Sequence, residues 1–357
     1  MRLVKSYGSF KCRTIWPLLY VDWKRQRQHL RQVGLGVVGT GFWGENQVRV
    51  LRQQNESCRL LGICDLNEKR AREVGSKYGI PWYSDLERFL QLPGLEAVTI
   101  CTPTHTHFEV ASRTLEEGKH LLVEKPMTGN RDQAEKLVKA AGKAGRKLLV
   151  GFIERFNPGV GMVKEMLERN EAGEVILATG RRVTRWPVRI GDVGVVKDTA
   201  IHDIDIMRFL LRKEVTLVYA QTGSLKHSFE DYAEIMLRFD HGTTGFIDAN
   251  WLTPRKVRTL IITGSEATIN LDYISQEISV DDSEKTVKPT VKWDEPLRLE
   301  LENYVKTVRE DLEPSPSGKD AIEAIKICDA ALESGRTQRV MELQKAEIAA
   351  LSHGKTR

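Results

Sequence analysis

The sequence predicts an α/β protein that begins with a doubly wound parallel sheet and continues into an antiparallel sheet with one covered face. Three observations support this fold class. The 357 residues are 41% apolar and 29% charged, which is the composition of a globular chain. From Val33 to Val150, short apolar runs alternate with helical segments. After Gly151, apolar and polar residues alternate with a period of two, as in a half-buried strand.

The first half has the order of elements that forms a parallel sheet. Helical segments follow the apolar runs, and a helix between two strands is the usual crossover that makes the strands parallel. We expect six strands in a doubly wound arrangement, and apolar runs locate five of them. The apolar runs lie at Val33–Val38, Arg59–Cys64, Ala97–Cys101, His120–Val123 and Lys147–Val150, with helices that include Phe108–Glu117 and Asp132–Ala144.

The second half has the pattern of an antiparallel sheet. Asp240-His241-Gly242 lies between two alternating runs and has the composition of a hairpin turn. The expected strands are Val175–Val183, Thr216–Thr222, Tyr232–Phe239, Thr244–Ile247, Val257–Thr263, Thr268–Tyr273 and Glu277–Val280. The expected helices are Val160–Arg169, Thr199–Leu211, Leu297–Glu310 and Lys319–Ser334.

The positive charge is concentrated at the amino terminus. The formal net charge is +5, but residues 1–32 carry eight Lys and Arg against Asp22 alone, so the other 325 residues sum to −2. This balance argues against a nucleic-acid partner for the folded body. The longest early apolar run, Ile15–Val21, is interrupted by Pro17 and is much shorter than the roughly 20 residues of a membrane span. We therefore expect no nucleic-acid and no membrane partner.

The cysteines indicate a reducing compartment. They are odd in number and have no CxxC spacing, which argues against a disulfide framework or a zinc site. We predict a cytoplasmic protein without a metal site. The five cysteines are Cys12, Cys58, Cys64, Cys101 and Cys328.

The two ends of the chain differ from the rest. Residues 1–32 form a basic extension for which three interpretations are open: a flexible basic arm, an additional oligomer contact, or a misassigned start with translation beginning near Leu30 or Val33. We favour the last and exclude this segment from the fold. Residues 341–357 are expected to form a charged C-terminal tail.

The motif Gly39-Thr40-Gly41-Phe42-Trp43-Gly44 predicts a dinucleotide-binding turn. It follows a strand and opens a helix, so its first two glycines allow a tight turn and a close approach to a pyrophosphate at the positive helix end. The third glycine allows the helix to pack closely on the sheet. We expect Gly39, Gly41, Phe42, Trp43 and Gly44 to bind the cofactor.

Asp65 predicts which dinucleotide binds. It lies 21 residues after Gly44, at the end of the next strand, where a carboxylate accepts hydrogen bonds from the adenosine ribose and repels a 2′-phosphate. The predicted cofactor is therefore NAD. Lys69 and Arg70 follow closely enough to moderate this preference.

Two further loops leave the carboxyl ends of strands, where an open α/β sheet binds its ligand. We expect Thr102, Pro103, Glu124 and Lys125 to line the nicotinamide half of the cofactor site. Lys125 lies between an apolar run and a proline, a position that would hold its ammonium in a cleft. The histidines of the first loop, at positions 105 and 107, are better explained as helix-start or surface residues.

A third pattern places an acid and a histidine on one helix. A helix from Thr199 would put Asp198, His202 and Asp205 along one face, opposite a core-facing row. Two interpretations are equally open: a helix cap with a solvated polar face, or a proton-transfer site. Histidine is the side chain best suited to exchange a proton near neutral pH.

Together these patterns resemble the Gfo/Idh/MocA oxidoreductase family, over about residues 33–340. The segment Gly151–Pro158 is also similar to the crossover segment of that family. The resemblance implies a Rossmann domain, 33–150, and an α/β domain, 151–340, whose large open sheet binds substrate and makes a homodimer or homotetramer contact. It implies that Lys125, Asp198 and His202 are catalytic. We expect the substrate to contact these three residues and also Arg155, Asn157 and Arg182.

Within that family, residues 181–198 are similar to prokaryotic, especially archaeal, UDP-N-acetylglucosamine 3-dehydrogenases. Arginines suit the paired oxygens of a diphosphate, although an exposed sheet face with alternating charge gives the same pattern. The resemblance thus implies NAD-dependent oxidation at C3 of UDP-N-acetylglucosamine. The alternative is an inositol 2-dehydrogenase or another hexose or sugar-phosphate dehydrogenase. A non-enzymatic NAD-sensing regulator is disfavoured, because it has no need of both Lys125 and His202.

Overall fold

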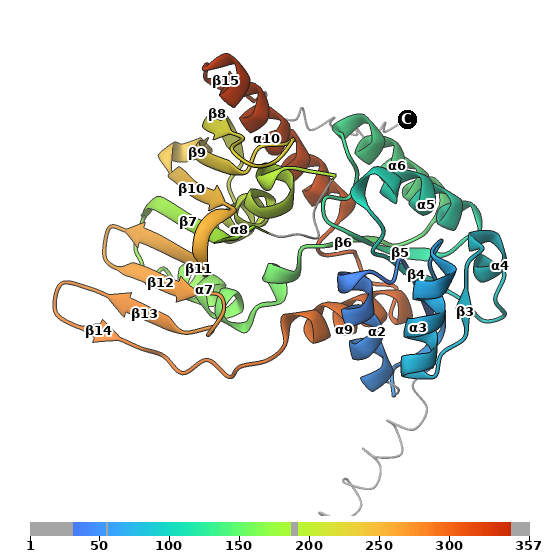
Figure 1. Cartoon of the computed structure of the whole chain (residues 1–357). Helices are drawn as coiled ribbons and strands as arrows, with labels where there is room; N and C mark the ends of the chain where they lie inside the picture. Colours follow the sequence, from blue (N-terminus) through green and yellow to red (C-terminus); the bar gives the residue numbers. More distant parts are fainter. Residues whose placement is uncertain (1–30, 55, 187–191, 344–357) are drawn as a thin grey trace, which may run out of the picture.

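A computed structural model describes residues 31–54, 56–186 and 192–343 (Figure 1). The expectations for residues 1–30 and 344–357, which include nearly all of the basic extension and most of the C-terminal tail, lie outside the described residues. Cys58, Cys64, Cys101 and Cys328 carry free thiols.

The first domain is a six-stranded parallel sheet in the order β3-β2-β1-β4-β5-β6, as predicted. Helices cover both of its faces, and every residue of β1 is buried, which explains why this strand is a continuous apolar run. The strands are β1 Val33–Val38, β2 Cys58–Cys64, β3 Trp82–Tyr83, β4 Ala97–Ile100, β5 His120–Glu124 and β6 Leu148–Gly151. The helices are α2 Phe42–Gln53, α3 Glu68–Tyr78, α4 Leu86–Leu90, α5 Thr104–Glu116 and α6 Arg131–Ala144.

The second domain contains a nine-stranded sheet in the order β14-β13-β12-β11-β7-β10-β9-β8-β15. Its pairs are antiparallel except β7 with β10, so the predicted mostly antiparallel sheet is confirmed. The strands are β7 Val175–Arg185, β8 Val215–Gly223, β9 Tyr232–Phe239, β10 Thr244–Asn250, β11 Leu252–Gly264, β12 Thr268–Asp272, β13 Ile278–Asp281, β14 Thr286–Val287 and β15 Met341–Glu342. The helices are α7 Pro158–Glu168, α8 Ile201–Leu211, α9 Pro296–Arg309 and α10 Gly318–Thr337.

The turn at residues 240–242 connects β9 and β10, as expected for a hairpin. His241 and Gly242 have φ angles of 56° and 93°, in the left-handed region that tight turns use. The structure also corrects the expected start of the tail, because Met341 and Glu342 form β15, which pairs with β8.

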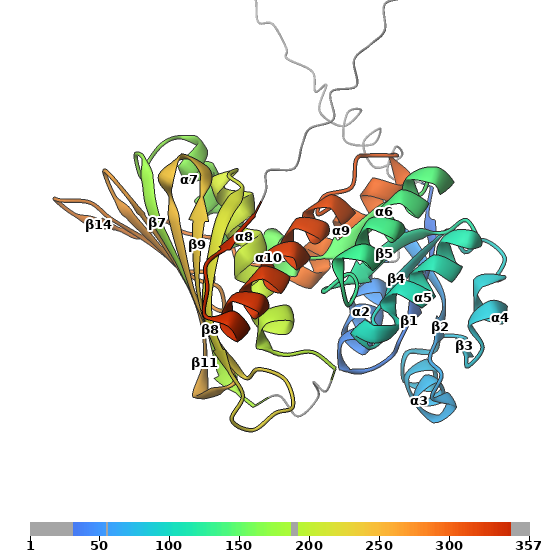
Figure 2. The ribbon, with the colours of Figure 1, turned by 90° about the horizontal axis from the view of Figure 1, so that it is seen from above.

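Helices α8 and α10 lie between the nine-stranded sheet and the Rossmann domain, and no helix of the described residues lies on the outer face of that sheet (Figure 2). The residue pattern follows this arrangement. Along β9 every second residue is buried, and the residues between them are exposed or half-buried. The sheet therefore has the one covered face that its alternating sequence predicts.

Helix α9 returns the chain to the first domain. It lies within the 151–340 range, yet Leu297, Leu301 and Tyr304 pack in one cluster with β1. The Tyr304 hydroxyl accepts a hydrogen bond from the Val98 amide at 3.1 Å and donates one to the His120 carbonyl at 2.9 Å. This packing binds the segment that follows the large sheet to the Rossmann core.

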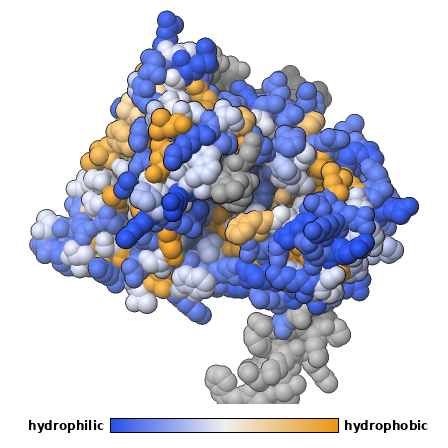
Figure 3. Space-filling model, viewed as in Figure 1, coloured by the Kyte–Doolittle hydropathy of each residue, from blue (hydrophilic) through white to orange (hydrophobic). Residues whose placement is uncertain are grey.

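The surface in Figure 3 is mostly hydrophilic, with hydrophobic residues in separate patches. Within the described parts of the chain, we find no helix with the length and apolar character needed to cross a bilayer.

Candidate active site

The glycine turn after β1 forms a cradle with one open side. A Cβ atom at Gly39, whose φ is 86°, would lie 2.7 Å from backbone atoms of Cys101 and Thr102. A Cβ at Gly44 would lie 1.8 Å from the Gly39 carbonyl oxygen. Gly41, in contrast, has nothing within 4 Å of an added Cβ. The turn is thus closely packed on the protein side and accessible where a pyrophosphate would approach.

The first turn of α2 fits the same ligand. Its N-cap is Gly41, which has no side chain to bind the first amides of the helix, and Phe42 beside it is 64% exposed. An uncapped helix N-terminus attracts a phosphate through its amides and its dipole. The residues present therefore fit a dinucleotide at the predicted position.

Asp65 follows β2 and is bound to the glycine turn. Its Oδ2 accepts hydrogen bonds from the Thr40 amide at 2.7 Å and the Thr40 hydroxyl at 2.9 Å, and its Oδ1 accepts from the Asn67 amide at 2.9 Å. Arg70 donates to the Thr40 carbonyl at 2.7 Å and pairs with Glu45. The carboxylate therefore lies beside the cradle, and the guanidinium of Arg70 is already paired.

Trp43 and Glu124 contact each other. The indole nitrogen of Trp43 and the amide nitrogen of Gln47, which donates at 2.8 Å, both bind Glu124 Oε1. Burial raises the pKa of Glu124 to about 7, although Lys125 and the indole hydrogen bond act to lower it. Glu300, on α9, is also buried, and burial together with the charge of Glu124 raises its pKa well above the usual range. A poorly solvated pair of carboxyl groups thus lies behind the site.

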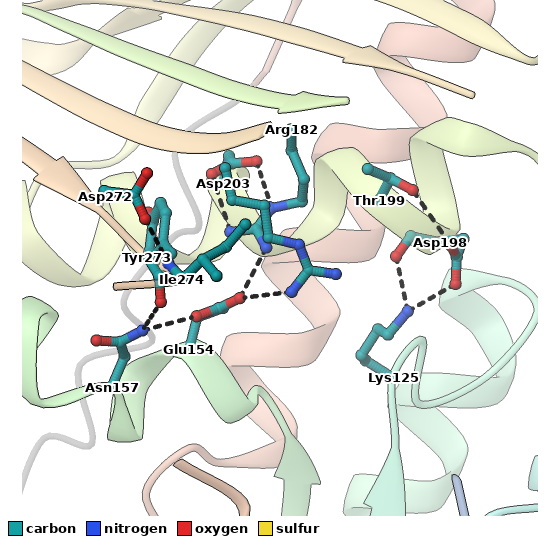
Figure 4. Close-up of polar contacts among 11 residues, drawn as sticks. Lys125, Glu154, Asn157, Arg182, Asp198, Thr199, Asp203, Asp272, Tyr273 and Ile274 are labelled. Atoms are coloured by element: carbon teal, nitrogen blue, oxygen red, sulfur yellow. Dashed lines mark hydrogen bonds and ion pairs between the residues drawn. The ribbon is translucent and has the colours of Figure 1, made fainter. Parts of the chain in front are cut away.

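Lys125 and Asp198 join the two domains (Figure 4). The ammonium nitrogen of Lys125, at the end of β5, donates to the Asp198 carbonyl at 2.6 Å and to its Oδ1 at 2.8 Å. Both side chains are 15% exposed. Proline 126 follows Lys125 through a cis peptide bond and ends the strand. The structure therefore brings together two of the three predicted catalytic residues.

Thr199, expected only as the start of the helix, and Trp251, which the sequence did not single out, hold Asp198 from the other side. The Thr199 hydroxyl lies 3.2 Å from Asp198 Oδ2, and the indole nitrogen of Trp251 donates to the Thr199 hydroxyl at 3.0 Å. Trp251 packs edge-on against Trp186 with ring centroids 5.6 Å apart. Only the tertiary contact between Trp251, which follows β10, and the turn before α8 reveals this chain of hydrogen bonds.

His202 lies in the first turn of α8, directly after a π-helical turn, Val196–Ala200, that carries Asp198. It is 9% exposed. Of the two interpretations of this helix face, the solvated one is wrong: Asp205 is also buried, because α8 lies between the large sheet and the Rossmann domain. π-Helical turns of this kind are frequent at functional sites.

The predicted substrate ligand Arg182 lies inside a buried ion-pair network (Figure 4). It donates to Asp203 Oδ2 at 2.9 Å and to Glu154 Oε1 at 2.7 Å, and its side chain is 3% exposed. Burial opposes the charge of Arg182, but Asp203 and Glu154 hold its pKa above the usual range. The guanidinium is thus closed off by carboxylates, and the network positions the helix that carries His202.

Arg155 and Asn157 have similar positions. Arg155 forms a two-bond pair with Asp205 at 2.6 and 2.8 Å, and its side chain is 7% exposed. Asn157 caps α7 and donates to the Tyr273 carbonyl at 2.9 Å. The structure corrects the expectation that these side chains face the substrate, because their polar atoms are engaged with α8, with α10 and with the start of α7.

The loop after β4 is joined to the loop after β5 by a buried histidine. His107 contacts the Thr102 carbonyl at 2.8 Å and the Pro126 carbonyl at 2.9 Å. Burial lowers its pKa, whereas the two carbonyl oxygens act to raise it. Pro103 starts α5, and Thr102 lies against the glycine turn. These two residues are therefore placed at the predicted edge of the sheet.

Comparison with known proteins identifies both domains. Residues 33–152 match the Gfo/Idh/MocA oxidoreductase family profile, described as an NAD-binding Rossmann fold, and residues 160–270 match the C-terminal domain of the same family. The prediction of NAD as the cofactor is confirmed by this match.

Two curated relatives are inositol dehydrogenases. The scyllo-inositol 2-dehydrogenase (NAD+) of Bacillus subtilis is 28% identical over 331 residues, covering 87% of this chain and 96% of the relative. The myo-inositol 2-dehydrogenase of Thermotoga maritima is 27% identical, covering 87% of this chain and 98% of the relative. The solved structure of UDP-N-acetylglucosamine 3-dehydrogenase from Acidithiobacillus ferrooxidans is similar with a TM-score of 0.78 at 22% identity, covering 85% of this chain and 98% of the other. That likeness establishes the fold.

Replacing Asp65 tests how the cofactor is selected. We expect Asp65→Ser to raise kcat/KM for NADP relative to NAD by about tenfold. This corresponds to about 1.4 kcal/mol, part of the ~4 kcal/mol of repulsion between unit charges about 4 Å apart near a protein surface. Steady-state rates with both cofactors measure the ratio. Glu68→Ser, which removes an exposed charge from the next helix, should leave it unchanged. A higher kcat/KM for NADP in the unmodified protein would show that Asp65 does not bind the ribose.

The raised pKa of Glu124 predicts a pH-dependent stability. Between pH 4.5, its ordinary pKa, and about pH 7, the folded protein keeps a proton that the unfolded chain loses, so the free energy of unfolding falls as pH rises. The contribution is on the order of 3 kcal/mol, at about 1.4 kcal/mol per pH unit. Denaturant unfolding should show that the free energy of unfolding falls less between pH 5 and pH 7.5 for Glu124→Gln than for the unmodified protein. The exposed-site control Glu109→Gln should match the unmodified protein; equal falls in all three would contradict the assignment.

Proposed function

The chain belongs to the Gfo/Idh/MocA family of oxidoreductases, and we propose that it oxidises a secondary hydroxyl of a ring polyol of the inositol type to a ketone. It is an NAD-dependent dehydrogenase acting on an alcohol. The observation that carries this proposal is the Lys125–Asp198 pair, one turn before His202, at the carboxyl edge of the NAD-binding sheet.

The proposed chemistry gives each residue a separate task. His202 takes the proton of the substrate hydroxyl, and Lys125 donates a hydrogen bond to the same oxygen as its negative charge develops. Asp198 keeps the ammonium in place through two acceptors, its carbonyl and its carboxylate. NAD supplies the hydride acceptor. The low exposure of Lys125 and Asp198 strengthens these electrostatic effects, because little water screens them.

The polyol substrate is better supported than UDP-N-acetylglucosamine. Two relatives that each cover 87% of this chain are named inositol dehydrogenases. Two described arginines of the segment are also engaged within the protein: Arg182 is buried among carboxylates, and Arg181 pairs with Asp248 at 2.8 Å on the opposite face of β7. Neither of these two guanidiniums is therefore available to a diphosphate.

We also propose that the outer face of the nine-stranded sheet binds a second copy of the chain. A row of successive cross-strand neighbours crosses five strands on this face: Ile261, Thr179, Phe246, Met236 and Tyr219. Phe246 and Met236 are 40% and 43% exposed. An apolar row on a sheet face without helices is typical of a subunit contact.

Substrate turnover and two active-site variants test the proposed function. We expect NAD reduction, followed at 340 nm, with myo-inositol or scyllo-inositol, and slower reduction with UDP-N-acetylglucosamine. Lys125→Ala and His202→Ala should each lower kcat by about a thousandfold or more, because proton transfer and charge stabilisation each contribute that order of rate. The dissociation constant of NAD should change little.

The outcomes of this experiment are distinct. A near-normal kcat in either variant would show that the replaced residue is not catalytic. Faster turnover of the nucleotide sugar than of either inositol would overturn the proposed substrate class.

The proposed subunit contact predicts an assembly that a single charge disrupts. Phe246→Glu should lower the mass measured by size-exclusion chromatography with light scattering, because it places an unpaired charge in the apolar row. Leu312→Glu, at a residue that is equally 40% exposed but lies near the Rossmann domain, should keep the mass of the unmodified protein. A monomeric unmodified protein would rule out the contact.

A further inference from the structure

Two cations on β11 lie close to the site and have no assigned task. Leu260 and Ile262 are fully buried on the inner face of β11, which faces α8, so alternation places Arg258 on that same face. Lys256 lies in the segment where the register with β7 shifts, but the charges of Arg258, Glu154 and Arg182 all act on it, so it lies near the same cluster. Arg258 pairs in register with Arg182 of β7. Both neighbours are positively charged, and like charges opposite each other on a sheet repel. The strand therefore brings positive charge to the side where the catalytic helix begins.

The carboxylates nearby do not use all the donors of this group. Asp203 binds Arg182 with both oxygens, at 2.9 and 3.3 Å. Glu154 Oε1 is shared, at 2.7 Å from Arg182 and 3.3 Å from Arg258. Three cations thus face two carboxylates, and Arg258 has one weak acceptor for its five N–H donors. For Lys256, no ion pair is found among the described residues.

The charge that remains is accessible. The Arg258 side chain is 37% exposed, whereas that of Arg182 is 3% exposed. Burial and the neighbouring Arg182 lower the pKa of Arg258, and burial and Arg258 lower that of Lys256. The same groups are close enough to the catalytic turn for Asp198 to affect Arg258. Two neighbouring cations whose N–H donors lack acceptors, close to the reacting groups, can bind an anionic ligand.

We propose that Lys256 and Arg258 bind an anionic substituent of the substrate, a carboxylate or a phosphate on the polyol or sugar ring. This inference rests on the proposed dehydrogenase function and narrows its substrate class. Arg182 does not bind the substituent; it fixes the position of Arg258 through their shared partner, Glu154. An acid bound there would be held on the side of the large sheet, with its ring directed toward Lys125 and His202.

Matched substrates and matched variants test the proposal. We would compare kcat/KM of NAD reduction for glucose, glucuronate and glucose 6-phosphate, which differ at one substituent and separate the carboxylate from the phosphate source. At least one anion should exceed glucose by about tenfold, the effect of one or two charge-assisted hydrogen bonds. Lys256→Met/Arg258→Met should remove this preference. Lys256→Met alone, at an exposed residue, should remove part of it and guards against a folding defect in the double variant.

Arg255→Met is the control, because Arg255 is an exposed cation on the opposite face of the same strand. This variant should keep the full preference for the anionic substrate over glucose. The proposal is overturned if glucose is used as well as both anions, or if Arg255→Met loses as much as the double variant; in those cases the dehydrogenase function stands.

A binding readout separates the two proposals. Quenching of NADH fluorescence by glucuronate or glucose 6-phosphate should depend on Lys256 and Arg258. If this binding occurs and no polyol or sugar reduces NAD, the anion site stands and the proposed function falls. If none of the probes binds or reacts in a way that depends on these two residues, the anion site falls.

Discussion

The ion pair between Lys125 and Asp198 is the contact on which the site depends, because its two residues come from different domains. Lys125 leaves the carboxyl end of β5, whereas Asp198 lies in the π-helical turn that leads into α8. The ammonium binds the backbone carbonyl of Asp198 as well as its carboxylate, so the pair fixes the turn itself. A displacement of one sheet relative to the other would break both bonds and move His202 away from the cofactor edge. Helix α9 opposes such a displacement, because it lies beyond the large sheet in sequence but packs in the Rossmann core.

Local signals in the sequence were sufficient to predict the glycine turn and the acid beside it. A glycine turn, a strand before it and an acid after the next strand depend on residues that are close in sequence, and the structure places Gly39, Gly41 and Asp65 together. Elements that depend on distant partners were not predictable in the same way. Strand β3 has two residues and exists because it pairs with β2, and α9 has an ordinary amphipathic pattern that does not reveal which domain it packs against. The contribution of Trp251 likewise requires a contact between residues that are 52 positions apart.

Burial, more than residue type, separates structural from exposed charges here. Arg181 and Arg182 are adjacent and chemically identical, but strand alternation sends one to the outer face beside Asp248 and the other into a network with Asp203 and Glu154. The polar face of α8 follows the same logic. Its acids look solvated in the sequence because their partners, Arg155 and Arg182, lie 50 and 21 residues away in the chain. Buried charges of this kind are tolerated only when paired, so each acid of α8 indicates a basic partner on a neighbouring element.

The charges around α8 therefore form two layers with different consequences. In the inner layer, Arg155 with Asp205 and Arg182 with Asp203 have closed geometry and little exposure, so they add no net field and fix the helix. In the outer layer, the shared Glu154 leaves Arg258 with one acceptor, and Arg258 and Lys256 bring positive charge to the side of the large sheet near Asp198. A positive field at that position stabilises an alkoxide as a hydroxyl loses its proton, and it also attracts anions. The same positive charge would thus favour both the proposed reaction and the binding of anionic substrates. Glu154 is bound mainly by Arg182 of the inner layer, and this pairing leaves Arg258 of the outer layer without a full carboxylate partner.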